Sequence, residues 1–375
     1  MKITFGTNTL RIFNLIIVLS LVMLFSYLLF TVARKIITED LGDLPYSMYE
    51  SKFIDVENLK KAKKFGELFA IKDSIIFKDQ VIGSVNQFIK LPNGNYLISD
   101  GITREIYIFN SKGEFLRRLG NKGSGPGEFL YPIDVKFNDK DGLIYVLDIK
   151  LSRVSAYDTT GKYQFSFNIR RRGEHMILVS ERLYVYGAGY IQEDMVSCFN
   201  SKNGKLLFTF CESSDFIKSI KMPISGKVGG CVLYKNRIFL IHPYEYVIRI
   251  FNLSGEKLKD IKVNSSLYRY PKLTPDSFID ISTFTPILSP VLNLGDIFFI
   301  IIQIPDEQKT KNYLEIFYLP EEKVLTSFNL DGMYPIFIDR EGYVYFSYQP
   351  LGDKPYELPN PVIYICEFIP LKVKR

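Results

Sequence analysis

Residues 93–119 read NGNYLISDGITREIYIFNSKGEFLRRL, and residues 141–167 read DGLIYVLDIKLSRVSAYDTTGKYQFSF. The two segments share one pattern: an apolar run that ends in aspartate, a second run that ends in an aromatic residue, a turn with glycine, and a third run. In both segments the aspartate lies nine residues before the aromatic residue. Because short apolar runs separated by turn residues are typical of β-strands, the pattern indicates a repeated antiparallel unit.

Turn glycines set the length of this repeat. Gly113 and Gly161 occupy the same position in the two segments and lie 48 residues apart. A period of about 45 residues with four strands per unit is typical of a β-propeller blade. Four looser copies of the pattern follow, over residues 182–208, 236–258, 295–319 and 340–368. The sequence therefore predicts an all-β fold, a six-bladed β-propeller that spans residues 67–375.

The last copy of the repeat lacks a fourth strand before Arg375. An unpaired sheet edge exposes backbone N–H and C=O groups, and native folds hide such edges. We therefore expect residues at or near 68–71 to supply the missing outer strand and to close the ring. Two longer connections, residues 213–228 and 265–286, fall between the third, fourth and fifth copies, where both could fold over one face.

Composition limits the classes of function. Of the 375 residues, 47% are hydrophobic and 23% are charged, which supports a large core and excludes a disordered chain. The net charge of +6 is spread along the chain, whereas nucleic-acid binders concentrate basic residues, so no nucleic-acid partner is expected. The four cysteines form no Cys-x-x-Cys pair and the chain has two histidines, which disfavours a zinc site and excludes a multi-histidine metal site.

An uncharged, strongly apolar run lies between Arg11 and Arg34. A helix of this length spans the hydrocarbon core of a bilayer, whereas the apolar part of a secretory signal is shorter, about 7–15 residues. We therefore predict three N-terminal segments: a cytoplasmic tail (residues 1–11), a single transmembrane anchor (residues 12–33) and a tether (residues 34–66). Thr31-Val32-Ala33 also fits a cleavage site, which leaves a cleaved signal as the alternative.

A glycine-rich joint, Gly123-Ser124-Gly125-Pro126-Gly127-Glu128-Phe129, links the two opening segments. A phosphate-binding loop would carry a Lys-Ser or Lys-Thr pair and open a helix, whereas here a strand is predicted to follow. The joint is therefore interpreted as a crossing between blades, in which glycine allows positive φ and proline fixes φ. Its structural positions are Gly125, Pro126, Gly127 and Phe129.

Equivalent positions in a repeat are expected to serve equivalent structural roles. Asp100 and Asp148 end their strands at the same position, and we expect Asp148 to hydrogen-bond to the next turn or to Arg153. The sequence Asp139-Lys140-Asp141-Gly142 resembles the start of a calcium loop but lacks the later ligands, so an ordinary hairpin turn is expected. The sequence thus indicates no catalytic, cofactor-binding or metal-binding residue.

The joint, followed by Pro132 and Asp134, resembles the inter-blade signature of NHL-type repeats. The rest of that repeat is matched by Asp148, Arg153 and Tyr157, and in the first copy by Asp100 and Phe109. In the first copy, Glu105 stands where the family usually has arginine. The resemblance implies a propeller with NHL-like blades and adds no activity.

Two further segments, Ile54-Asp55 and Val81-Ile82-Gly83-Ser84-Val85, resemble the six-bladed propeller proteins that are abundant in the envelopes of Bacteroides-like bacteria. This resemblance implies a location in the cell envelope. Those proteins are usually lipoproteins, whereas this chain has an apolar anchor and its first cysteine is Cys198. Some similar propellers are enzymes, including metal-dependent lactonases. The alternative hypothesis is therefore a metal-dependent hydrolase or lyase whose carboxylate and asparagine ligands lie in the central channel.

Two basic clusters are candidate contact surfaces. Residues 55–64 are predicted to form a short helix with Asp55 as its N-cap, and its lysines lie close to the anchor. Arg170, Arg171 and Arg172 lie where the second blade passes to the third and could bind a phosphate, an acidic sugar or an acidic protein. Solvated lysines and arginines are the ordinary alternative for both clusters.

The leading hypothesis is a membrane-anchored binding or scaffolding module in a bacterial cell membrane, with its propeller on the periplasmic or extracellular side. Its expected partners are the membrane and a protein or glycan on one face of the propeller, and no cofactor is expected. The step from propeller to binding rests on analogy, because rigid blades that carry variable loops suit recognition.

Overall fold

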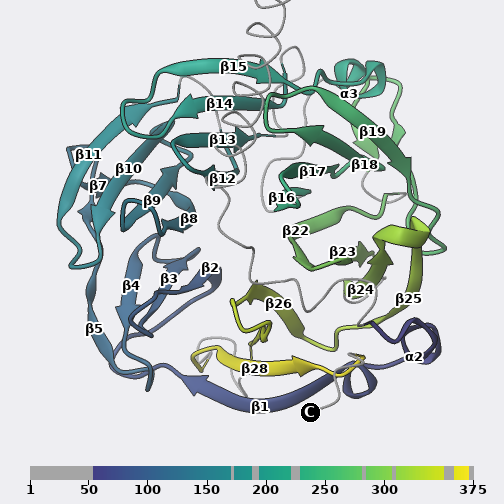
Figure 1. Ribbon diagram of the computed structural model, residues 1–375, viewed down its shortest axis with the longest axis horizontal. Helices are drawn as coiled ribbons and strands as arrows, with labels where there is room; N and C mark the ends of the chain where they lie inside the picture. Colours follow the sequence, from purple (N-terminus) through teal and green to yellow (C-terminus); the bar gives the residue numbers. More distant parts are fainter. Residues whose placement is uncertain are drawn as a thin grey trace, which may run out of the picture. The chain divides into compact units, whose positions relative to one another are not determined.

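The structure is a computed structural model that describes residues 54–169, 173–187, 194–220, 229–280, 284–305, 310–349 and 359–370. Within these residues, six four-stranded antiparallel sheets surround one axis (Figure 1). This arrangement confirms the predicted all-β, six-bladed propeller. The predicted cytoplasmic tail (1–11), the transmembrane anchor (12–33) and the arginine cluster (170–172) lie outside the described residues.

Blades 1 to 5 follow the order of the chain, from an inner strand to an outer strand. Blades 1 to 3 consist of β2 (Val85–Lys90), β3 (Tyr96–Asp100), β4 (Ile106–Phe109) and β5 (Phe115–Arg118); β8 (Pro132–Asn138), β9 (Leu143–Asp148), β10 (Arg153–Asp158) and β11 (Tyr163–Asn168); and β12 (His175–Val179), β13 (Arg182–Tyr186), β14 (Val196–Asn200) and β15 (Leu206–Phe210). Blades 4 and 5 consist of β16 (Gly230–Tyr234), β17 (Arg237–His242), β18 (Glu245–Asn252) and β19 (Lys257–Lys262); and β22 (Ile287–Leu294), β23 (Ile297–Ile304), β24 (Lys311–Tyr318) and β25 (Lys323–Asn329).

Blade 6 is built from both ends of the described chain. It consists of β26 (Met333–Ile338), β27 (Val344–Tyr348), β28 (Val362–Phe368) and, as its outer strand, β1 (Phe69–Ile76). β1 pairs antiparallel with β28, so that Phe69 lies opposite Phe368 and Ile76 lies opposite Val362. The prediction that residues near 68–71 close the ring is therefore confirmed.

The inner strands form a closed circle. Each of β2, β8, β12, β16 and β22 contacts the inner strand of the next blade, and β26 contacts β2 (Figure 1). Second and third strands lie in the interior, and those of blade 1, Tyr96–Asp100 and Ile106–Phe109, are buried throughout. Because both faces of each sheet pack against neighbouring sheets, these strands are continuously apolar instead of alternating.

The end of the predicted tether packs on the propeller. Asp55 accepts a hydrogen bond from the backbone N–H of Asn58 and caps helix α2 (Val56–Lys61), which confirms the predicted N-cap. Leu59 is fully buried in the same apolar cluster as Phe299, and the hydroxyl of Thr326 donates to the carbonyl of Ala62. A short 3-10 helix, η3 (Phe65–Glu67), leads into β1. None of the helices formed by the described residues is long and apolar enough to cross a bilayer.

The two longer connections carry small elements of their own. The first contains α3 (Asp215–Ser219), capped by the Ser214 hydroxyl, which accepts a hydrogen bond from the N–H of Ile217. The second contains a short hairpin of β20 (Lys272–Leu273) and β21 (Ile279–Asp280). The buried carboxyl of Glu315 anchors the second connection, since it accepts a hydrogen bond from the Ser265 hydroxyl at 2.5 Å. Burial raises the pKa of Glu315.

Candidate functional site

The repeated aspartates hold neighbouring segments together instead of facing a substrate. The Asp148 carboxylate, 1% exposed, accepts hydrogen bonds from the backbone N–H groups of Lys150 and Leu151 in the next turn and of Leu130 and Tyr131 in the preceding joint. The bonds to Lys150 and Leu151 confirm the prediction that Asp148 hydrogen-bonds to the next turn.

Asp100 repeats this arrangement in blade 1. It accepts hydrogen bonds from the N–H groups of Gly83 and Ser84 before β2 and of Ile102 in the following turn. Each aspartate therefore binds two segments of backbone that meet where one blade begins and its second strand ends. A carboxylate that is committed to so many backbone donors serves structure.

The glycine-rich joint is the crossing between blades 1 and 2, as predicted. Its strands β6 (Asn121–Lys122) and β7 (Glu128–Phe129) pair in parallel, and Gly127 has φ of +75°. The Arg153 guanidinium donates to the carbonyls of Ser124, Gly125 and Glu128 and so fixes the joint from β10. In blade 1 the matching Glu105 instead forms an ion pair with Arg118, at 3.2 Å.

The remaining repeat positions are also structural. Gly113 and Gly161 have φ of +77° and +88°, which favours glycine at these turns, and an added Cβ at Gly113 would lie 2.3 Å from the Ile76 carbonyl oxygen. Pro126 lies within the same joint, and Phe129 is buried against Tyr157, with ring centroids 5.5 Å apart. Gly125 donates its N–H to the Glu128 carboxylate at 2.7 Å.

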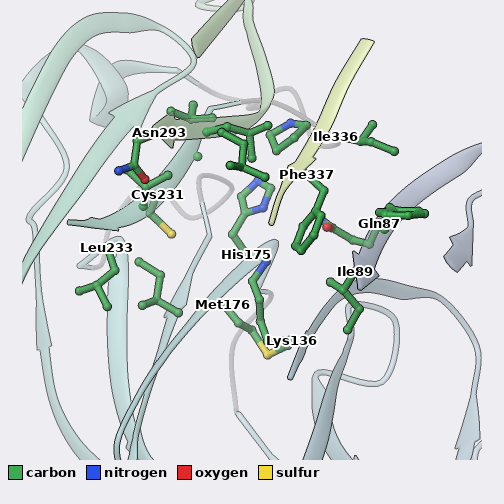
Figure 2. A pocket seen from close by; sticks show the side chains of 18 of the residues that line it. Gln87, Ile89, Lys136, His175, Met176, Cys231, Leu233, Asn293, Ile336 and Phe337 are labelled. Carbon is green, nitrogen blue, oxygen red and sulfur yellow. The ribbon is translucent and has the colours of Figure 1, made fainter. Parts of the chain in front are cut away.

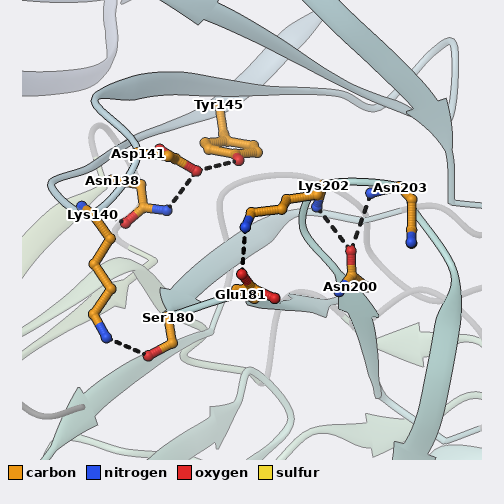
Figure 3. Close-up of polar contacts among 9 residues, drawn as sticks. All are labelled: Asn138, Lys140, Asp141, Tyr145, Ser180, Glu181, Asn200, Lys202 and Asn203. Carbon is orange, nitrogen blue, oxygen red and sulfur yellow. Dashed lines mark hydrogen bonds and ion pairs between the residues drawn. The ribbon is translucent and has the colours of Figure 1, made fainter. Parts of the chain in front are cut away.

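The calcium-like segment is a hairpin turn between β8 and β9. Figure 3 shows that the Asp141 carboxylate accepts hydrogen bonds from the Tyr145 hydroxyl at 2.7 Å and from the Asn138 amide at 2.9 Å. The Lys140 ammonium donates to the Ser180 hydroxyl in the corresponding turn of blade 3, at 2.8 Å. Protein donors therefore occupy the Asp141 oxygens that a cation would need.

A cavity lies on the propeller axis. It has a volume of about 310 Å³ and is lined by residues from all six inner strands. Most of its wall is apolar and includes Ile89, Ile177, Leu233, Leu292 and Ile336. Its polar wall residues are Gln87, Lys136, His175, Cys231 and Asn293. Figure 2 shows these side chains around one shared space, although they come from five different blades. Small-molecule sites are typically concave and mostly apolar, with a few polar groups.

The charge on the cavity wall is balanced. Lys136 carries the one permanent charge among the described residues of the cavity wall. His175 and Cys231 are the other wall residues that can titrate. The Lys136 ammonium donates to the Asp134 carboxylate at 2.9 Å, and Asp134 is completely buried behind it. Asp134 also accepts hydrogen bonds from the N–H groups of Val135 and, in blade 3, of Met176. Asp134, noted in the sequence as part of the joint signature, therefore connects two blades and neutralises the lysine.

The cavity adjoins a mouth between blades 6, 1 and 2. A depression of about 390 Å³ there shares Ile89, Lys136, Phe337 and Ile338 with the cavity wall. It lies at the turns that follow β2, β8 and β26, and its charged rim includes Lys90, Lys136, Asp139, Asp339, Arg340 and Glu341. Apart from Lys136, which is paired with Asp134, the rim has two cations and three anions.

Ion pairs join the turns around this mouth. Lys90 contacts Asp339 at 3.0 Å and Glu341 at 3.3 Å, and Arg340 contacts Asp139 across from blade 6 to blade 2. Arg340 and Asp139 are both more than half exposed. Exposed ion pairs contribute only about 0–1 kcal/mol, so the pair that crosses the mouth can separate readily.

Cys231 lies on the cavity wall, so its chemical reactivity can be used to probe the cavity. Burial raises the pKa of its thiol to about 12, an effect that the nearby Lys136 opposes and Asp134 reinforces. All four cysteines are free thiols; Cys198, Cys211 and Cys366 are buried, whereas Cys231 is partly exposed on the cavity wall. The thiolate is the reactive form, so Cys231 should react slowly but selectively with a reagent that enters the cavity.

We expect methyl methanethiosulfonate, a small neutral thiol reagent, to modify Cys231 before the other three cysteines in the folded full-length protein. Because the pKa lies near 12, the rate should rise about tenfold per pH unit between pH 7 and 9. Peptide mass spectrometry measures the modification at each cysteine. Cys231→Ser is the control, and equal modification of Cys198 or Cys366 would contradict an open cavity.

Among the described residues, no three His, Cys, Asp or Glu side chains come together as metal ligands would. The sequence led us to expect a central channel, but it did not predict Lys136 and Cys231 as polar residues of its wall. Lys136 offered one signal, because it is the single basic residue of the inner strand Pro132–Asn138. The Arg170, Arg171 and Arg172 cluster is not part of the described residues, and its proposed contact role stays a prediction.

The sheets, their closure and the axial cavity define a six-bladed β-propeller. Residues 49–265 match the DUF5128 family, described as a 6-bladed beta-propeller. The chain belongs to this family, which confirms the family likeness that the sequence predicted. No curated protein matches the sequence.

Solved structures show the same fold. A presumed exported protein from Bacteroides fragilis aligns with 13% identity and a TM-score of 0.61, over 82% of this chain and 97% of that chain. A DUF4221 family member from Bacteroides vulgatus aligns with 10% identity and a TM-score of 0.58, over 80% of this chain and 97% of that chain. At these identities the likeness concerns the fold alone.

Proposed function

We propose that this protein is a membrane-tethered, extracytoplasmic binding module whose ligand occupies the cavity on the propeller axis. The observation that carries the proposal is the cavity itself. Six inner strands surround it, its wall is mostly apolar, and five polar side chains interrupt that wall. A pocket of this size and composition is typical of small-molecule sites, whose volumes start at about 300 Å³.

The arrangement favours binding over the metal-dependent hydrolase or lyase of the alternative hypothesis. The cavity wall carries an ammonium, two amides, an imidazole and a thiol, and the acids of the rim form ion pairs with Lys90 and Arg340. The buried aspartates at the repeat positions bind backbone N–H groups. Hydrolases and lyases of this type need several oxygen ligands aimed at one point.

Two observations support the location outside the cytoplasm. The apolar run at residues 12–33 has the length of a membrane-spanning helix, and the B. fragilis protein with the same fold is a presumed exported protein. Both agree with a propeller that is held at the outer side of a bacterial membrane by an N-terminal anchor. A protein or glycan bound to one propeller face remains part of this proposal.

Membrane topology tests the tether directly. In a Gram-negative host, the full-length chain should stay in the membrane pellet after carbonate washing, and protease should digest the propeller in spheroplasts but not in intact cells. The double variant Leu21→Lys, Leu24→Lys should leave the pellet, because each lysine in the middle of a spanning helix costs about 2.5–3.5 kcal/mol. Recovery of the unchanged chain in the soluble cytoplasmic fraction would disprove the tether.

A further inference from the structure

We infer that the cavity ligand is a neutral amphiphile, with an apolar body and one hydrogen-bond acceptor, and that an acid or an amine is disfavoured. This inference rests on the proposed binding function and adds the chemical class of the ligand. It follows from the charge balance of the cavity wall, which is set by one lysine and the aspartate behind it.

The apolar part of the ligand follows from the wall. Side chains of Ile89, Ile177, Leu233, Leu292 and Phe337 surround the space from five inner strands. Burying apolar ligand surface against such a wall gains roughly 25 cal/mol per Å². A ligand that is polar throughout would lose its hydration against a wall that is mostly apolar and would not regain enough hydrogen bonds there.

The acceptor follows from Lys136. An ammonium has three N–H donors, and one of them is committed to the Asp134 carboxylate at 2.9 Å. The side chain remains 35% exposed and lines both the cavity and its mouth, while Asp134 is 0% exposed. The Gln87 amide lies on the same wall. A carbonyl or hydroxyl oxygen of the ligand would therefore meet donors at this part of the wall.

The neutrality follows from the pairing. Lys136 and Asp134 together carry no net charge, and the acids at the mouth form ion pairs with Lys90 and Arg340. A ligand carboxylate would lose hydration against a mostly apolar wall whose described residues include no uncompensated cation to receive its negative charge. A ligand ammonium would meet the same problem with the opposite sign, because Asp134 is already paired. Uncompensated buried charge is strongly unfavourable.

Three probes of matched shape test this inference: 4-phenylbutanamide, 4-phenylbutanoate and 4-phenylbutylammonium. Each is added at equal concentration and pH 8 to the full-length protein in detergent, and protection of Cys231 from methyl methanethiosulfonate is measured. We expect the amide to protect at a concentration at least about tenfold lower than either charged probe. Strongest protection by the carboxylate or the ammonium, or equal protection by all three, would overturn the neutral class.

Two variants shift the charge balance in opposite directions. Asp134→Asn keeps a carbonyl oxygen beside Lys136 but leaves the cation uncompensated, so the carboxylate probe should gain about tenfold or more relative to the amide. Lys136→Met leaves Asp134 uncompensated, so the ammonium probe should gain instead. A thermal melt confirms that each variant is folded. An unchanged order of the probes in a folded variant would overturn the role of the pair.

The same experiment separates the two levels of the proposal. If Cys231 is modified readily and none of the probes protects it, ligand binding in the cavity fails, and with it the proposed function. If a charged probe protects best, the cavity binds ligands and only the inferred chemical class is wrong.

Discussion

Phe69→Ala is expected to destabilise the propeller by about 3–5 kcal/mol, which is the usual cost of truncating a buried phenylalanine. Phe69 opens the closing strand β1, is 2% exposed, and has ring contacts with Phe65, Phe299, Phe346 and Phe368 at 4.8–5.7 Å. The substitution therefore leaves a cavity where blades 5 and 6, β1 and the N-terminal segment meet. Chemical denaturation of the full-length protein measures the loss, and the thermal midpoint should fall by roughly 5–10 °C.

Ile76→Ala is the matched control for this experiment. Ile76 lies on the same strand but is 59% exposed, so its loss should change stability by less than about 0.5 kcal/mol. Comparing the two losses of stability separates the contribution of Phe69 packing, where β1 meets blade 5 and blade 6, from the effect of alanine on the strand propensity of β1. If both variants are equally stable, β1 does not hold the ring closed in the way that its pairing with β28 implies.

Asp148→Ala is the second large effect, with an expected loss of about 3–5 kcal/mol. Its carboxylate accepts hydrogen bonds from four backbone N–H groups at 2.6–2.9 Å, and alanine leaves all four without this acceptor. A buried N–H group without an acceptor costs about 1–3 kcal/mol. Water can reach those of the four N–H groups that are only partly buried, and this lowers the total loss of stability. Denaturant titration of the variant checks the value.

Three comparisons sharpen the Asp148 experiment. Asp148→Asn keeps one carbonyl oxygen and should lose less stability than alanine, while Asp100→Ala should lose a similar amount because it makes the same contacts in blade 1. Asp73→Ala, at an exposed position where the carboxylate caps only the N–H of Ser74, should be close to neutral. A neutral Asp148→Ala would show that the repeat does not depend on this residue.

The sequence was sufficient for the blades because each blade repeats local signals. Asp148, Gly161 and the glycine-rich joint act on chain neighbours or on the adjacent blade, so their spacing carries the information. Ring closure was also predictable, since an unpaired sixth blade required a strand from elsewhere. The docking of residues 54–66 was missed because a few apolar residues, such as Leu59, hold it to the propeller.

The residues that line the candidate site could not be predicted, for a physical reason. The cavity depends on residues as distant in the chain as Gln87 and Ile336, which lie on the inner strands of two different blades. The charge balance depends on Lys136, which lies two residues after Asp134 on a strand that faces the axis. A lysine two residues after an aspartate is a common pattern, and it does not by itself indicate a binding site. Only the closure of the ring brings these side chains together.

The pairing of β1 with β28 also sets the order of synthesis and folding steps in a newly made chain. The two strands lie about 300 residues apart in the sequence, so β1 leaves the ribosome long before its partner exists. Until residues 362–368 have been made, Phe69–Ile76 can pair only with a strand outside its own blade or with another molecule. Completion of the sixth blade therefore follows synthesis of nearly the whole chain, and a chaperone or a fast translocation step would have its greatest effect during that interval.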